Sequence, residues 1–162
     1  FRSGYPKPVT VTGTTYSKFS QNKSVNSSGW GTAQEKDGII DVEDMAVGFV
    51  RLENDATLDI EFSWASNIEQ DERFYELRGT KGGAVFRNGE LKIISEQIST
   101  VVELKPNLNF NSPVNEFEHF INCIQNDSEP IAKPEEAVIL MKIIDGIYQS
   151  AQAKREVKIT EG

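Results

Sequence analysis

The first part of the chain alternates between apolar and polar residues, and this pattern predicts a series of β-strands. The alternation is clearest in residues 56–65, where every second side chain is apolar: Leu58, Ile60, Phe62 and Trp64. Because successive side chains of a strand point to opposite faces, this strand has one apolar face for helices to cover and one charged face. Further strands are predicted at residues 8–16, 44–52, 74–80, 84–86, 91–94 and 98–104.

The strand at residues 44–52 carries apolar side chains on both of its faces. The two sets are Met45, Val47 and Phe49 on one side and Ala46, Val50 and Leu52 on the other. We predict that the set containing Val50 shares a face with Asp59 and Glu61, opposite the helices, and contacts a second copy of the chain there. Solvent exposure of that face is the alternative, because antiparallel sheets often leave one face wet.

The spacing of apolar residues becomes helical toward the end of the chain. Ser112 and Pro113 are typical of a helix N-terminus and predict a helix at residues 113–126, while Pro134 begins a second one at 134–154. A short strand is expected at residues 157–159. Strands followed by helices predict an α+β fold, with an open, predominantly antiparallel sheet of six or more strands and two C-terminal helices packed on one face. We expect one domain over residues 1–162.

A polar segment at residues 17–41 shows neither the helical nor the strand periodicity, so it predicts a long loop. Loops of this length often border a binding site. We therefore select Trp30 in the loop, Glu43 and Asp44 where the chain re-enters the sheet, and Trp64 at a strand end as substrate-side candidates. An exposed strand edge is the alternative for Glu43 and Asp44. Core packing is the favoured alternative for Trp64.

The composition of the chain argues against two classes of binding partner, nucleic acids and membranes. A net charge of −8 argues against nucleic acid, which requires concentrated positive charge. Neither an apolar run long enough to span a membrane nor a secretory signal is visible, so no membrane partner is expected. A single cysteine, Cys123, forms no internal disulfide, which favours the cytoplasm.

The chain offers little chemistry of its own. Gly79 to Gly83 is followed by strand-like residues and favours a hairpin turn over a phosphate loop, and no dinucleotide-binding glycine fingerprint occurs. The sole histidine, His119, lacks a sequence partner for catalysis or metal binding, and Cys123 is interpreted as a small core or boundary residue. We assign no catalytic, cofactor-binding or metal-ligating residue.

Five segments in order resemble the Gfo/Idh/MocA family, the family of glucose-fructose oxidoreductase and inositol dehydrogenase. These segments are Val42 to Ala46, Asn54 to Leu58, Glu76 to Gly82, Glu116 to Ile121 and Ile143 to Ala151. The resemblance implies a C-terminal α+β domain whose sheet helps to shape a sugar or polyol site and packs against another subunit. One departure from the family is Ala153-Lys154-Arg155, where the family often has a glycine before its last strand, so a less sharp helix end is expected.

The resemblance also implies what this chain lacks. The family's Rossmann glycines, the lysine of its Glu-Lys-Pro motif and the aspartate and histidine of its crossing helix have no matching positions, so the nucleotide-binding domain is expected to be absent. The parent enzyme is expected to be a dehydrogenase of a sugar, polyol or related hydroxy compound, with NAD or NADP as its cofactor. This chain alone is not expected to catalyse a reaction. A stand-alone self-association module is the main alternative, and a small carbohydrate-binding domain is a third possibility.

Overall fold

The computed structural model describes residues 6–19, 41–70, 72–97, 100–104 and 115–159. The chain has the predicted α+β fold, with antiparallel strands followed by two helices and a final short strand. It divides into two compact units, Phe1–Asn67 with Cys123–Gly162 and Ile68–Asn122. Within the described ranges, no helix is long and apolar enough to cross a membrane.

The first unit contains a four-stranded antiparallel sheet in the order β3-β2-β1-β8. Its strands are β1 (Pro8–Tyr16), β2 (Met45–Leu52), β3 (Thr57–Ser63) and β8 (Val157–Lys158). β2 and β3 form a hairpin in which Asp55 adopts a positive φ of 64° and its amide donates to the carbonyl of Leu52. The hairpin therefore brings the beginning of β2 beside the end of β3.

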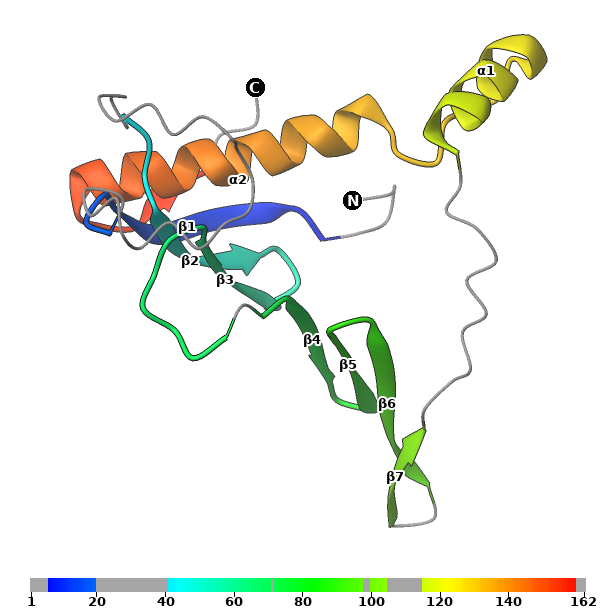
Figure 1. Cartoon of the computed structure of the whole chain (residues 1–162), viewed down its shortest axis with the longest axis horizontal. Helices are drawn as coiled ribbons and strands as arrows, with labels where there is room; N and C mark the ends of the chain where they lie inside the picture. Colours follow the sequence, from blue (N-terminus) through cyan, green and yellow to red (C-terminus); the bar gives the residue numbers. More distant parts are fainter. Residues whose placement is uncertain (1–5, 20–40, 71, 98–99, 105–114, 160–162) are drawn as a thin grey trace. The chain divides into compact units, whose positions relative to one another are not determined.

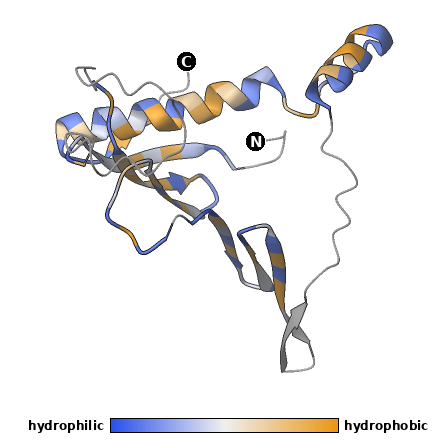
Figure 2. Ribbon diagram, in the orientation of Figure 1, coloured by the Kyte–Doolittle hydropathy of each residue, from blue (hydrophilic) through white to orange (hydrophobic). Residues whose placement is uncertain are grey.

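The long helix α2 (Pro134–Ala153) lies across β1 and β2 (Figure 1). Its buried side chains Ile143 and Ile147 pack against Val11 and Val50, which are both fully buried. Burial of such side chains is the main favourable contribution to folding. Figure 2 shows apolar positions along the helix, and Val138, Leu140 and Met141 of this helix are exposed.

The face assignment of β2 differs from the prediction. Val50 lies directly opposite Leu58, and directly paired residues of an antiparallel ladder share a face, so Val50 faces α2 together with Leu58. The predicted interface at Ala46, Val50 and Leu52 is therefore wrong. The face away from α2 carries the other apolar set, Met45, Val47 and Phe49, together with the charged residues Asp59 and Glu61.

The second unit contains its own four-stranded antiparallel sheet in the order β4-β5-β6-β7. Its strands are β4 (Phe74–Gly79), β5 (Gly82–Arg87), β6 (Glu90–Gln97) and β7 (Thr100–Leu104). The strands thus form two sheets where a single sheet was expected. Alternation fixes which face a side chain occupies but not which strands pair, and the segment 64–73 between β3 and β4 lacks the short turn that makes a hairpin.

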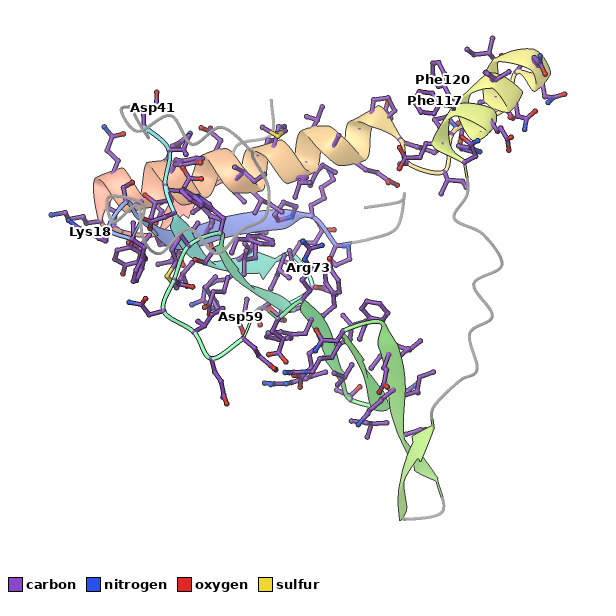
Figure 3. All side chains as sticks on the ribbon, in the orientation of Figure 1. Lys18, Asp41, Asp59, Arg73, Phe117 and Phe120 are labelled. Atoms are coloured by element: carbon purple, nitrogen blue, oxygen red, sulfur yellow. The ribbon has the colours of Figure 1, made fainter. Side chains whose placement is uncertain are left out.

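The first helix, α1 (Glu116–Asn126), begins later than predicted. The side-chain oxygen of Asn115 accepts hydrogen bonds from the amides of Phe117 at 3.1 Å and Glu118 at 3.4 Å, which is the geometry of a helix N-cap. The predicted cap, Ser112, lies outside the described residues. Phe117 and Phe120 are 80% and 63% exposed, and both are labelled on α1 in Figure 3. Helix α2 is the helix that packs on the sheet of the first unit.

Helix α2 ends at Ala153, and the residue that caps it, Lys154, adopts the left-handed conformation that usually favours glycine. The buried hydroxyl of Ser150 donates to the carbonyl of Arg155 at 2.7 Å and accepts from the amide of Gly13 at 2.9 Å. This side chain ties the turn after α2 to β1. The helix therefore stops without a glycine, and the chain continues into β8.

Candidate functional site

Three of the four predicted site residues lie together at one end of the sheet in the first unit. Glu43 and Asp44 directly precede β2, and Trp64 directly follows β3. The pairing of Met45 with Ser63 brings these two strand ends side by side. The fourth candidate, Trp30, lies outside the described residues. The hairpin between β2 and β3 is thus what assembles the site.

Asp44 is fully buried, so the interpretation of this residue as an exposed strand edge is wrong. Its Oδ2 atom accepts a hydrogen bond from the amide of Phe19 at 2.6 Å, and its own amide donates to the carbonyl of Tyr16 at 2.8 Å. A buried carboxylate is costly unless it is hydrogen-bonded, and these bonds connect the residues after β1 to the residues before β2. Asp44 therefore links the end of β1 and the residues after it to the beginning of β2.

Trp64 is partly exposed, at 37% of its surface, so it is not the core residue that its place in the apolar stripe suggested. Its indole Nε1 donates to the carbonyl of Glu43 at 2.7 Å, and its amide donates to the carbonyl of Asp44 at 3.2 Å. The ring therefore has a fixed orientation beside Glu43. Indole combines a large apolar surface with one polar atom, which suits it to the boundary between core and ligand.

Tyr148 completes the group, and the sequence analysis missed it. Its hydroxyl donates to the Oε1 atom of Glu43 at 2.6 Å across 105 residues of sequence. This hydrogen bond, followed by partial burial and the negative charge of Glu43, raises the pKa of Tyr148 above its ordinary value of 10.0. In the sequence, Tyr148 follows Ile144 and Ile147 at helical spacing and so counts among the apolar positions of its helix. The signal was its hydroxyl, because a tyrosine on such a stripe usually finds a polar partner for that group.

We call Glu43, Trp64 and Tyr148 the strand-end cluster. It combines one carboxylate, which accepts from the Tyr148 hydroxyl, with two partly exposed aromatic side chains, and Tyr148 is 43% exposed. Two depressions of the described surface lie elsewhere, one lined by Thr10 and Arg155 and the other by Thr10 and Asp55, and neither contains a member of the cluster. The cluster offers a carboxylate that can accept from hydroxyl groups and partly exposed aromatic surface beside it.

The other residues considered for chemistry, in the glycine-rich segment and on α1, lie outside the strand-end cluster. Gly79 and Gly82 pair directly at the turn from β4 to β5, and Gly82 has a positive φ of 155°, so the predicted hairpin turn is confirmed. His119 and Cys123 lie on α1, and Cys123, the single cysteine of the sequence, is buried.

The chain belongs to the oxidoreductase family whose C-terminal alpha/beta domain is named after Gfo, Idh and MocA, because the profile of that domain matches residues 6–159. The match confirms the resemblance described above. A curated relative is D-glucoside 3-dehydrogenase of Escherichia coli (strain K12), which is 28% identical over 166 residues. The aligned region covers 96% of this chain and 44% of that protein.

Solved structures share the fold. Levoglucosan dehydrogenase in complex with NADH has a TM-score of 0.71 at 16% identity, covering 96% of this chain and 46% of that one. Aldose-aldose oxidoreductase from Caulobacter crescentus, complexed with glycerol, has a TM-score of 0.65 at 19% identity, covering 94% of this chain and 42% of that one. The present chain therefore spans less than half the length of these relatives.

Proposed function

We propose that this chain is the substrate-side and oligomerisation domain of an NAD(P)-dependent oxidoreductase that acts on a sugar, a polyol or a related hydroxy compound. The observation that carries the proposal is the family match over residues 6–159. The curated relative named as a glucoside dehydrogenase supports a sugar as the substrate class. We place the protein in the cytoplasm, which its single cysteine supports.

In this proposal, a nicotinamide held by a nucleotide-binding domain would supply the hydride chemistry. The levoglucosan dehydrogenase complex with NADH supports NAD or NADP as the cofactor of such an enzyme. The residues of this chain bind and orient the substrate at the strand-end cluster, and the cofactor carries the hydride. The chain itself contains no dinucleotide-binding glycine fingerprint, so we assign the cofactor to the other domain.

Oligomerisation is assigned to the sheet face that α2 leaves uncovered. This open face carries the half-buried apolar residues Met45, Val47 and Phe49 with Asp59 and Glu61 beside them. A central apolar patch with charged residues around it is the usual composition of a protein interface. Because a face that meets its own copy must be self-complementary, we propose a homodimer or a larger homo-oligomer.

The direct test is an assay of the complete enzyme that contains this chain. Reduction of NAD or NADP is followed spectroscopically with glucose, methyl glucosides, levoglucosan, myo-inositol and glycerol. We expect reduction with at least one of these compounds. Oligomerisation without any reduction would favour the alternative of a self-association module, and sugar binding without reduction would favour a carbohydrate-binding domain.

A further inference from the structure

We infer that Glu43 recognises two neighbouring hydroxyl groups of a neutral cyclic sugar or polyol, and that Tyr148 and Trp64 position its carboxylate for that contact. The inference deepens the proposed function and rests on it for the substrate class. It assigns separate roles to the three members of the strand-end cluster, of which Tyr148 was not a sequence candidate.

The backbone at Glu43 is fixed from both sides. Its carbonyl accepts the indole proton of Trp64 at 2.7 Å. The next residue, Asp44, is fully buried, and its carbonyl accepts from the hydroxyl of Ser63 at 3.0 Å and from the amide of Trp64 at 3.2 Å. A binding group is most effective when its support is rigid, because little conformational entropy is then lost on binding.

The carboxylate of Glu43 retains capacity to bind a ligand. A carboxylate has about four acceptor sites on its two oxygens. The hydroxyl of Tyr148 occupies one site on Oε1, at 2.6 Å, and Oε2 makes no hydrogen bond to any described residue. The side chain is half-buried, so the remaining sites are still accessible. Tyr148 thus fixes one oxygen and leaves the other for hydroxyl donors.

The charge of the cluster selects the chemical class of the ligand. Among the described residues, no ion pair of a lysine or arginine includes Glu43. An anionic ligand such as a sugar phosphate would be repelled. Neutral hydroxyl groups donate well to a carboxylate, because hydrogen bonds to a charged acceptor are stronger than neutral ones.

The aromatic members suit the apolar part of a sugar ring. Trp64 is 37% exposed and Tyr148 is 43% exposed. Trp64 is hydrogen-bonded to the backbone carbonyl of Glu43, and Tyr148 to its carboxylate. A pyranose or cyclitol carries C–H groups on its faces and hydroxyls around its edge. Burial of those C–H groups against an aromatic ring is favourable, while the hydroxyls at the edge reach the carboxylate. An acyclic polyol lacks such a face and should bind more weakly.

The test uses nitrogen-15 and carbon-13 labelled chain, titrated with methyl β-D-glucopyranoside or myo-inositol up to about 100 mM, a range suited to weak millimolar binding. Trp64→Phe identifies the indole resonance of Trp64. We expect this resonance and the ring resonance of Tyr148 to shift saturably, and mannitol to bind more weakly. A merely structural role for Tyr148 would leave its ring resonance unmoved.

The variants decide the individual roles. Glu43→Gln is expected to weaken binding by about tenfold or more, since it removes a charged hydrogen-bond acceptor, and Tyr148→Phe to weaken it to a smaller extent. The matched controls Glu69→Gln and Tyr75→Phe change exposed residues outside the cluster and should bind as the unchanged chain does. Folding of each variant is checked from the remaining amide resonances.

The inference is overturned if the Trp64 resonance does not move at the highest concentration, or if Glu43→Gln binds as well as the unchanged chain. Preferential binding of glucose 6-phosphate would also overturn it, because the carboxylate should repel that anion. These readouts require no cofactor. Failure of this inference is therefore distinct from failure of the proposed function, which is measured as reduction of NAD or NADP.

Discussion

The hydroxyl of Tyr148 joins the C-terminal half of α2 to the residue that leads into β2, two segments separated by 105 residues. Its partner Glu43 is also bonded through its carbonyl to Trp64. Three residues from three different parts of the chain are thereby held in one place. At this scale, the protonation state of a single phenol controls whether the hydrogen bond exists.

The titration of Tyr148 tests this hydrogen bond. The pKa of Tyr148 in the folded chain is raised above 10.0. The hydrogen bond therefore makes its full contribution to stability below pH 10.0, and this contribution disappears as the pH rises through the raised pKa. Removal of the carboxylate in Glu43→Gln should lower the pKa of Tyr148, as followed by its ring carbon resonance between pH 8 and 12. Glu69→Gln is the control and should leave it unchanged. An equal pKa in both variants would contradict the assigned cause.

The sequence predicted part of this cluster and missed part for a physical reason. Glu43, Asp44 and Trp64 could be selected because they stand at strand ends, where binding residues often lie. Tyr148 could not be selected, because hydropathy placed it with the apolar side chains and its partner is distant in sequence. The burial of Asp44 also escaped prediction, since alternation does not indicate which polar residues close a loop.

Helix α2 and the sheet approach each other closely because glycines face the helix. A Cβ atom added at Gly13 would lie 2.8 Å from Cγ2 and 3.2 Å from the Cα of Ile147, and 3.1 Å from the carbonyl of Val47. A Cβ atom added at Gly48 would lie 2.9 Å from Cδ1 of Ile147. The Cβ atom at Gly13 would therefore meet backbone atoms, whereas the Cβ atom at Gly48 would meet the end of a flexible side chain.

These contacts predict different costs for the same substitution. Gly13→Ala should lower the free energy of unfolding by about 1–3 kcal/mol, because the helix must move away from the sheet. Gly48→Ala should cost less than about 1 kcal/mol, since Ile147 can rotate and alanine restricts the unfolded chain. Urea denaturation of the two variants measures the difference. Equal losses would show that the helix is not packed as described.

The element pattern was largely predictable, and the pairing was not. β-Branched and aromatic residues located β1 at Pro8–Tyr16, and period-two alternation located β3 at Thr57–Ser63. It did not reveal that β3 and β4 belong to different sheets. The face of Val50 was misassigned for the same reason, because only the register with β3 determines which set of apolar residues faces α2.

At the scale of the whole molecule, the open face of the first sheet is the proposed site of self-association. Val47 lies on this face, opposite Glu61 on β3. Val47→Asp places a second negative charge beside Glu61 and should reduce the sedimenting mass from a dimer or larger assembly toward a monomer.

Ile68→Asp is the matched control, because Ile68 is 59% exposed and lies in the segment after β3. It should sediment like the unchanged chain. Val50 is unsuitable for this test, since it is fully buried against α2 and a charge there would disrupt the core. An oligomer that survives Val47→Asp unchanged would place the interface elsewhere.

The central claim is that this chain forms the substrate side of a sugar-type oxidoreductase, and hydrogen exchange on the complete enzyme tests it most directly. Amide exchange is compared without ligand, with NADH, and with NADH and a substrate found in the reduction assay. We predict that the substrate slows exchange at residues 41–44 and 63–65, where Glu43 and Trp64 lie, beyond any effect of NADH alone. Unchanged exchange in both segments, with protection elsewhere on substrate addition, would contradict the claim.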